Sequence, residues 1–318
     1  MADDWIRPLG SSQDPEYEVA IRPGDPGWSH TGLLVATLAD GESRSIDTGD
    51  CEYVVLPLAG GGVDVECGSD SAQLTGRPDV FSGPTDCAYI PRDSSFTVTS
   101  RGGGKVAFPF AKAASQLPFA VVAAGEVPTE LRGAGQCSRQ VQNFGTPGTM
   151  DADAIIACEV ITPAGNWSSY PPHKHDTYRE GLESALEEIY YFEMRTEPAR
   201  STPGEPSGDG PHPPADRSDS GAASPATPRP VGYQVVNGTD ERPIDVKAEV
   251  STGDVVLVPH GWHGPSMTPP GYDMYYLNVM AGPGPGRVWL ICDDPDHGWV
   301  RSTWAHQDVD ARLPIHDR

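Results

Sequence analysis

Short apolar runs alternate with turn-forming residues over residues 30–125. The runs are rich in Val, Thr, Phe and Tyr, and clusters of Gly and Asp separate them. This pattern is typical of short strands in an antiparallel sandwich or barrel. We therefore predict strands at residues 31–38, 52–58, 62–67, 87–91, 96–100 and 105–111.

A second series of the same kind follows a segment at 126–150 that we interpret as a connector. The strands predicted in it lie at residues 154–162, 187–194, 231–238, 254–259, 273–282 and 287–293. The whole pattern predicts an all-β protein of two tandem barrels, an N-terminal one over residues 1–125 and a C-terminal one over 151–318.

Residues 197–230 interrupt the second series. They contain nine prolines and almost no large apolar side chains. Such a segment cannot bury enough surface to offset the entropy lost on ordering. We expect a disordered loop between two strands, with His212 in solvent.

The two series resemble each other, which indicates an internal duplication. "GDCEYVVLPLAGG" (49–61) parallels "LEEIYYFEM" (186–194), and residues 82–96 parallel 251–263. The first copy has no His-x-His pair, and Phe96 stands where the second copy has His263. We therefore expect the chemistry in the C-terminal barrel and none in the N-terminal one.

Four residues of the second copy form a candidate metal site. His173 and His175 are two apart, so on a strand they would share a face. Glu188 opens the next predicted strand, and His263 follows the turn after "GDVVLVP". Three imidazoles and one carboxylate suit Zn, Mn, Fe or Ni, whereas Ca and Mg prefer oxygen ligands. His260, at a turn apex, is read as exposed.

Composition narrows the classes of protein. The chain has 318 residues and a formal net charge of −23, without a basic run, which argues against a nucleic-acid partner. An anionic ligand would need locally placed cations. The six cysteines lie singly, the first residues do not form a signal peptide, and no apolar run could span a bilayer. We expect a soluble cytoplasmic protein without membrane contact.

The order of these residues resembles the cupin family. The first cupin motif resembles Gly165…His173-Lys-His175…Glu188, and the second resembles Gly253 to His263, followed by Asn278. Twelve residues separate His175 from Glu188, more than is usual, which leaves the choice between Glu187 and Glu188 open. We interpret the extra residues as a looped-out segment.

Longer stretches resemble the two-barrel 5-deoxy-glucuronate isomerase family of myo-inositol catabolism. They are "NWSSYPPHKHD", "LEEIYYFE", "GYDMYYLNVMAGPG", "RGAGQCSRQV" (132–141) and "ARLPI". The resemblance implies conversion of 5-deoxy-D-glucuronate to 5-dehydro-2-deoxy-D-gluconate. This aldose–ketose isomerisation passes through an enediolate, whose charge one divalent metal can stabilise.

Proton transfer and carboxylate binding need further groups. The candidates for catalysis are Glu188, Tyr190 and Lys174. Those for substrate binding are Arg139, Arg179, Tyr275 and Asn278, with Arg301 as a further cation. Alternation lets only one of Tyr275 and Tyr276 face inward, and Asn278 shares the face of Tyr276.

Other functions stay open at this point. One is a 4-deoxy-5-hexosulose-uronate ketol-isomerase, which shares the overall plan. A cupin dioxygenase would use the same ligands around iron, and a two-barrel sugar-binding protein would have no activity. Each of the enzyme functions implies a small-molecule substrate, which for the isomerases is an anionic sugar acid. A homo-oligomer is compatible with the pattern.

Overall fold

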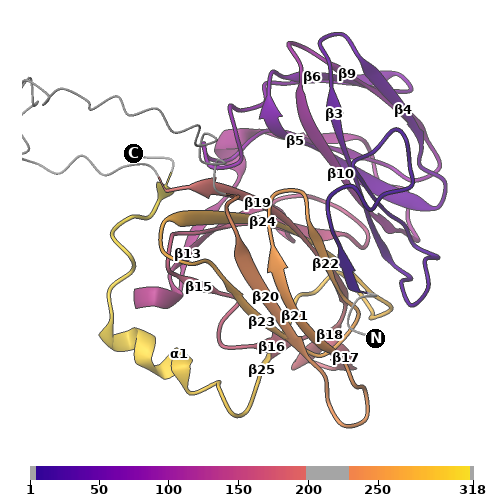
Figure 1. Cartoon of the computed structure of the whole chain (residues 1–318). Helices are drawn as coiled ribbons and strands as arrows, with labels where there is room; N and C mark the ends of the chain where they lie inside the picture. Colours follow the sequence, from indigo (N-terminus) through magenta and orange to yellow (C-terminus); the bar gives the residue numbers. More distant parts are fainter. Residues whose placement is uncertain (1–4, 198–228, 316–318) are drawn as a thin grey trace, which may run out of the picture.

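The computed structural model describes residues 5–197 and 229–315 and consists almost wholly of antiparallel strands in two barrels (Figure 1). The prediction of an all-β fold of tandem barrels is confirmed. Most of the predicted loop at 197–230, with His212, lies outside the described residues. No helix in the described ranges is long and apolar enough to cross a membrane.

The first barrel combines a six-stranded sheet, in the order β11-β8-β5-β10-β3-β2, with a four-stranded sheet, β4-β9-β6-β7. The six strands are β2 (Val19–Ile21), β3 (Thr31–Leu38), β5 (Cys51–Gly60), β8 (Cys87–Ile90), β10 (Gly104–Lys112) and β11 (Ala120–Val122). The four are β4 (Ser43–Asp47), β6 (Val63–Cys67), β7 (Asp70–Leu74) and β9 (Ser95–Ser100).

The second barrel combines a seven-stranded sheet, β1-β22-β19-β24-β14-β13-β12, with a sheet in the order β21-β20-β23-β16-β25, where β15 also pairs with β23. The seven strands are β1 (Ile6–Arg7), β12 (Thr129–Arg132), β13 (Arg139–Gly145), β14 (Ile156–Thr162), β19 (Glu187–Thr196), β22 (Val255–Val258) and β24 (Tyr272–Ala281). The others are β15 (Trp167–Ser168), β16 (His173–Lys174), β20 (Gly232–Asn237), β21 (Asp245–Val250), β23 (Trp262–Met267) and β25 (Cys292–Asp293).

Smaller elements complete the chain. A hairpin of β17 (Asp176–Arg179) and β18 (Glu183–Ala185) occupies the long spacing between His175 and Glu188. Short 3₁₀ helices lie at Ala124–Glu126, Gly135–Cys137 and Trp304–His306, and α1 spans Val300–Thr303. The hairpin is the form that the predicted looped-out segment takes.

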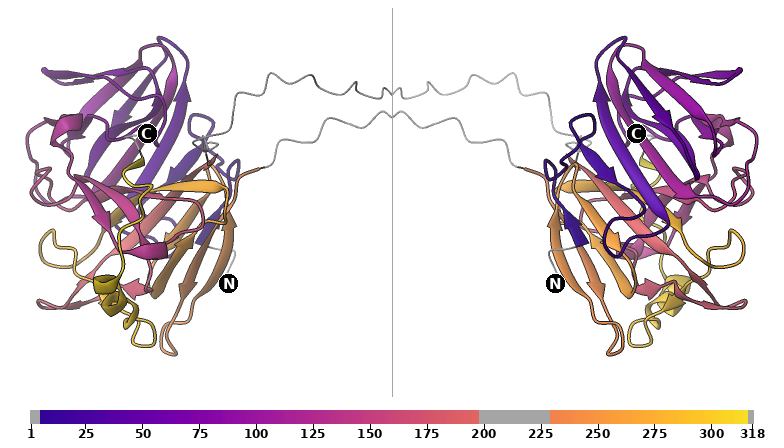
Figure 2. Two further views of the ribbon diagram at one scale, coloured as in Figure 1. Left: turned by 90° about the vertical axis from the view of Figure 1, so that its left-hand side faces the viewer. Right: turned by 90° about the vertical axis from the view of Figure 1, so that its right-hand side faces the viewer.

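The largest sheets of the two barrels pack face to face, and the barrels stack one on the other (Figure 2). Alternation along the central strands divides their side chains between two cores. On β19, Ile189 and Tyr191 enter the core shared by both barrels, whereas Tyr190 and Phe192 enter the second barrel. Such strands are buried on both faces, which explains their nearly continuous apolar runs.

Segments outside the predicted C-terminal barrel complete its sheet. The predicted connector forms β12 and β13, which pair with each other and then with β14. β1, from the start of the chain, pairs with β22. Of the strand predicted at 287–293, only the last two residues form one, β25. The pairing partner of a short strand is a long-range choice that local pattern does not encode.

Aromatic side chains fill the interior of the first barrel. Tyr53 stacks on Phe110 with ring centroids 4.4 Å apart, and Phe96 packs against both Tyr53 and Phe108. These rings are buried. In the parallel between the two copies, Tyr53 corresponds to Glu188 and Phe96 to His263. The first barrel therefore has a packed apolar interior at the place of the candidate site.

Candidate active site

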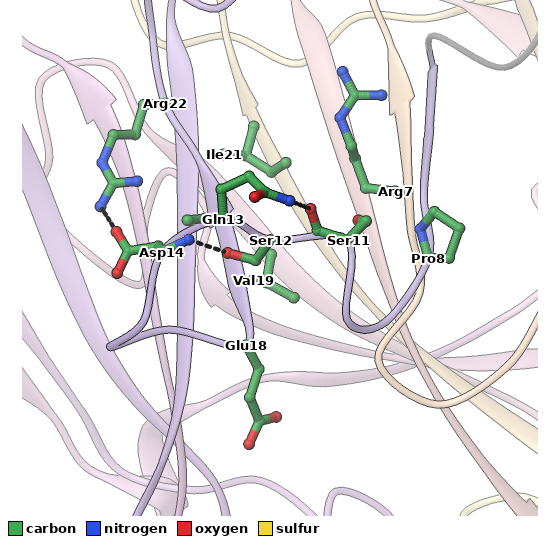
Figure 3. A pocket seen from close by; sticks show the side chains of 11 residues that line it. Arg7, Pro8, Ser11, Ser12, Gln13, Asp14, Glu18, Val19, Ile21 and Arg22 are labelled. Carbon is green, nitrogen blue, oxygen red and sulfur yellow. Dashed lines mark hydrogen bonds and ion pairs between the residues drawn. The ribbon is translucent and has the colours of Figure 1, made fainter.

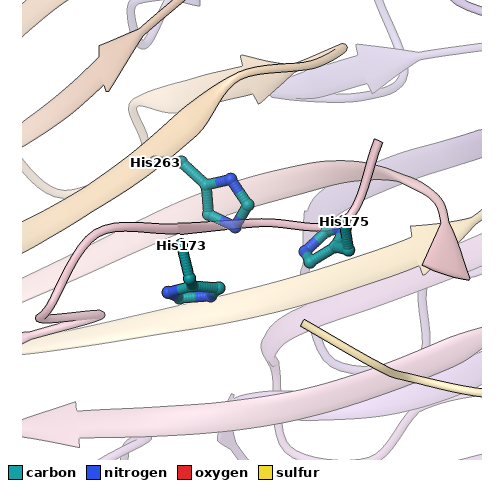
Figure 4. A group of neighbouring side chains, drawn as sticks. All are labelled: His173, His175 and His263. Atoms are coloured by element: carbon teal, nitrogen blue, oxygen red, sulfur yellow. The ribbon is translucent and has the colours of Figure 1, made fainter. Parts of the chain in front are cut away.

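Three histidine side chains meet inside the second barrel, where one ring nitrogen from each lies within 4.8 Å of the others (Figure 4). His173 on β16 pairs in register with His263 on β23, and His175 follows directly after β16. Glu188, at the start of β19, joins them: its Oε2 lies 3.1 Å from Nε2 of both His175 and His263. All four side chains are buried.

Alternation along β19 separates the two adjacent glutamates. Glu188 faces the histidines, whereas Glu187 turns to the first barrel and accepts hydrogen bonds from the backbone of His30 and Thr31, both at 2.7 Å. Position therefore favours Glu188 as the carboxylate ligand.

The hydrogen bonds of the three rings fit a bound metal. Each Nδ1 lies 3.1–3.4 Å from a backbone carbonyl oxygen. Such an acceptor holds the proton on Nδ1 and leaves the Nε2 lone pair for a metal. Nε2 of His263 is buried and makes no aligned hydrogen bond within the described residues, although Glu188 is near. Three imidazoles and a carboxylate suit a divalent transition metal.

The charge states in the group also favour a cation. Burial and the neighbouring imidazoles hold the pKa of His173 well below its usual range, so this ring is neutral. Burial opposes a charge on His175 as well, but its hydrogen bond to Glu188 outweighs that and raises the pKa. Burial alone would raise the pKa of Glu188, yet the imidazoles of His175 and His263 hold it at about 2. Glu188 is therefore an anion at neutral pH.

A cavity of about 250 Å³ opens beside the histidines. Its walls come from both sheets of the second barrel and from the C-terminal segment. The lining residues are Arg132, Arg139, Val141, Val160, Ser169, His173, Glu188, Tyr190, Tyr276, Asn278, Trp289, Ile291 and Arg301. The size suits a small molecule, and the polar groups on the walls converge near the candidate metal site.

Two of the arginines in the cavity wall are already paired. Arg132 lies 2.7 Å from Glu130, and Arg301 donates to Asp293 at 2.6 Å. Their charges are balanced before any ligand binds.

Arg139, on β13, differs from them. Its side chain is 6% exposed, lies against the ring of Trp304 and donates to the carbonyl of Cys137. It pairs with no carboxylate in the described parts of the chain. Burial lowers its pKa to about 10, so the guanidinium stays charged at neutral pH. Arg139 is thus a buried cation in the cavity wall whose counter-ion a ligand can supply.

Two phenols reach the cavity and share hydroxyl partners. The Oγ of Ser169 lies 3.3 Å from the hydroxyl of Tyr190 and 3.1 Å from that of Tyr276, and Ser168 also hydrogen-bonds to Tyr276. Ser169 adopts φ 48°, a left-handed conformation that few non-glycine residues take. Burial raises the pKa of Tyr276 to about 12 and that of Tyr190 well above its usual value, so both phenols keep their protons.

Tyr275 does not reach the cavity. Its hydroxyl donates to Glu159 at 2.7 Å inside the core that the two barrels share. Residues two apart on β24 share a face, so Tyr276 and Asn278 line the cavity together. The prediction that Tyr275 binds the substrate does not fit this placement. Asn278, by contrast, lies where it was expected.

Lys174 and Arg179 also turn away from the cavity. Nζ of Lys174 lies 2.8 Å from Asp176 and 2.6 Å from Glu183, and Arg179 lies 2.6 Å from the same glutamate. Neither cation belongs to the cavity wall. Their placement does not fit the predicted roles in catalysis and substrate binding, because both cations fasten the β17–β18 hairpin. His260 is partly buried, not exposed.

A different pocket, also of about 250 Å³, lies between the N-terminal segment and β2 (Figure 3). Its lining contains neither histidine nor cysteine. Two arginines, Arg7 and Arg22, line it, and Arg22 is paired with Asp14 at 2.8 Å, as Figure 3 shows. The convergence of ligand nitrogens, a buried cation and phenols thus singles out the cavity in the second barrel.

Comparison with known proteins gives a consistent picture. The sequence profile of the KduI/IolB family matches residues 5–300. The 5-deoxy-glucuronate isomerase of Geobacillus kaustophilus is 36% identical over 298 residues, which cover 93% of this chain and 94% of that protein. The 5-deoxy-glucuronate isomerase of Bacillus subtilis strain 168 is 34% identical over 273 residues, 86% of this chain and 88% of the relative.

Solved structures agree with the fold. An IolB-like protein from Salmonella typhimurium LT2 superposes with a TM-score of 0.77 at 30% identity, covering 93% of this chain and 98% of that one. A mutant oxalate decarboxylase of Bacillus subtilis superposes with a TM-score of 0.57 at 10% identity, over 91% of this chain and 79% of the other. The second likeness concerns the two-barrel fold alone.

Proposed function

Because the chain belongs to the KduI/IolB family, we propose that it is an isomerase that converts 5-deoxy-D-glucuronate to 5-dehydro-2-deoxy-D-gluconate in inositol catabolism. The observation that supports this most directly is the cavity itself. It places a buried group of three histidines and a glutamate beside a buried arginine that pairs with no carboxylate among the residues described. An isomerase of a sugar acid needs both features: a site for the reacting oxygens and a cation for the carboxylate.

His173, His175, His263 and Glu188 would hold one divalent metal, of the class Zn, Mn, Fe or Ni. Bound there, it would act as a Lewis acid toward the oxygens on the two carbons between which the carbonyl group moves. This ligand set leaves positions open for those oxygens if the metal prefers six ligands.

The chain's own groups divide the remaining work. Arg139 binds the carboxylate of the substrate, which orients the sugar acid in the cavity. Asn278, on the same wall, can bond to a hydroxyl of the substrate. Oε2 of Glu188 faces two imidazoles. Oε1 is therefore the candidate general base for the carbon-bound proton.

The two phenols hold protons at the cavity surface. We assign Tyr276, rather than Tyr190, as the residue that donates a proton to a substrate oxygen. Tyr276 bonds to both Ser168 and Ser169, so the serine hydroxyls can return a proton to it. Of the two serines, Tyr190 hydrogen-bonds to Ser169 and so supports the same network.

The proposal is tested by metal content and turnover on the same samples. Elemental analysis of the wild type is expected to give about one transition metal per chain, and 5-deoxy-D-glucuronate is expected to isomerise without oxygen. His175→Ala should lose both, whereas His260→Ala, a histidine of the same barrel outside the group, should keep both. A protein without metal would refute the site, and oxygen consumption would indicate a dioxygenase. Turnover of 4-deoxy-5-hexosulose-uronate instead would overturn the substrate assignment.

We also propose that the protein is cytoplasmic, as expected from the sequence. All six cysteines are free thiols, as in a reducing cytoplasm.

A further inference from the structure

A buried carboxylate of the second barrel is bound by the backbone of the first. Glu187, 8% exposed, accepts hydrogen bonds from the consecutive backbone amides of Ser29, His30 and Thr31 at 3.1, 2.7 and 2.7 Å. The hydroxyl of Thr31 donates a further one at 3.0 Å. These amides lie at the start of β3 and just before it, and β3 packs against β19. Charge-assisted bonds of this kind, removed from water, are strong and set a fixed distance between the partners.

The first barrel returns the same contact. Glu52 on β5 is fully buried and accepts hydrogen bonds from the consecutive backbone amides of Asp153, Ala154 and Ile155 at 2.8, 2.7 and 2.7 Å. The hydroxyl of Tyr89 donates to it at 2.7 Å. Each barrel thus contributes one glutamate that binds three amides and a hydroxyl. The two contacts are related by the internal duplication.

The two contacts differ in what stands next to the glutamate. After Glu52 comes Tyr53, which stacks on Phe110 in the aromatic interior. After Glu187 comes Glu188, the carboxylate of the metal group. Before Glu187 comes Leu186, whose carbonyl oxygen lies 3.4 Å from Nδ1 of His175 and whose amide donates to the carbonyl of His175 at 2.7 Å. Residues 186–188 therefore orient two of the four candidate ligands.

We propose that Glu187 is a positioning residue, through which the first barrel fixes the geometry of the metal group in the second. The inference rests on the metal site of the proposed function. Thr31 and the two residues before it bind the carboxylate of Glu187. This contact fixes the backbone of residues 186–188, which orients the side chain of Glu188 and the ring of His175. The first barrel thereby contributes to metal affinity, and not only to the stability of the fold.

The duplication supplies a matched control. Glu187→Gln and Glu52→Gln each remove one buried anion that binds three backbone amides, and both are expected to lower the melting temperature of the metal-free protein. Titration calorimetry of metal-free protein with Mn²⁺ separates them. Glu187→Gln should bind Mn²⁺ about tenfold more weakly or worse, as is usual when a group supporting a ligand is lost. Glu52→Gln should stay within about twofold of the wild type, since none of the groups that Glu52 binds belongs to a candidate ligand.

A milder pair covers the case in which the glutamine variants do not fold. Thr31→Val removes the hydroxyl donor to Glu187, and Tyr89→Phe removes the donor to Glu52. Weaker Mn²⁺ binding in Thr31→Val, with unchanged binding in Tyr89→Phe, supports the inference. Equal affinities in both members of a pair overturn it. If the wild type binds Mn²⁺ while His175→Ala does not, the metal site is supported. The comparison within each pair then tests the positioning role alone. A wild type that binds neither Mn²⁺ nor Zn²⁺ refutes the metal site as well.

Discussion

Replacement of Arg139 by methionine should separate stability from substrate binding. Arg139 is 6% exposed and its guanidinium has no carboxylate partner in the described residues, so in the absence of a ligand the buried charge destabilises the fold. Methionine has a similar length and fills irregular space without a charge. We expect Arg139→Met to bind the substrate poorly while the protein unfolds no more easily than the wild type.

The structure sets the size of both effects. A pKa of about 10, where 12.5 is usual, corresponds to about 3 kcal/mol of unfavourable free energy for the buried charge. The contact with Trp304 and the hydrogen bond to Cys137 offset roughly 2 kcal/mol of this. The free energy of unfolding of the ligand-free variant should therefore rise by about 1 kcal/mol. A substrate carboxylate left without its buried partner should cost about 2–5 kcal/mol, which is at least about a 30-fold fall in kcat/KM.

Urea denaturation of ligand-free protein and steady-state kinetics with 5-deoxy-D-glucuronate measure the two quantities. Arg132→Met is the matched control, because Arg132 lines the same cavity but is paired with Glu130 at 2.7 Å. Its kcat/KM should fall much less than that of Arg139→Met. The reasoning is refuted if Arg139→Met loses stability by more than about 2 kcal/mol while kcat/KM is unchanged.

Two further predictions concern residues around the cavity. Burial alone would raise the pKa of Glu183, but hydrogen bonds from Lys174 and Arg179 lower it, so the ion pairs stabilise the fold above pH 4.5 and are lost as the pH falls further. In urea titrations at pH 7, the free energy of unfolding of Lys174→Ala should be about 3 kcal/mol lower than that of the wild type. At pH 3.5 the difference should be smaller, and kcat should be unchanged. A large fall in kcat would contradict the structural role of Lys174. Tyr276→Phe should lower kcat about 100-fold or more without loss of bound metal, and an unchanged kcat would exclude Tyr276 as the proton donor.

Local pattern was enough for most of the longer strands and for the side on which Glu188 lies. The alternation along residues 187–194 predicts that Glu188 and Tyr190 share a face, and they do, since each lines the cavity. The order of ligands along the chain also predicted the group that His173, His175 and His263 form, because each follows or begins a strand of the same barrel.

Local pattern failed where both faces of a strand are buried. Tyr275 and Tyr276 are equally apolar neighbours on β24, and only the packing of the first barrel decides which one faces the cavity. The cations Lys174 and Arg179 are near the ligands in sequence, but their partner Glu183 belongs to a hairpin whose fold the sequence did not reveal. The strands β12 and β13 were missed because we interpreted residues 126–150 as a connector, although β12 pairs with β13 and β13 with β14.

The pairing of β1 with β22 bears on how the protein is made. Ile6 lies opposite Val256, so β1 leaves the ribosome well before the strand with which it pairs. Until both are present, β22 offers an unpaired edge, which in other proteins favours association between chains. Just beyond the pair, the backbone amide of Leu9 donates to the carboxylate of Asp254 at 2.9 Å. A segment that precedes the first barrel in sequence thus covers the edge strand of the second barrel.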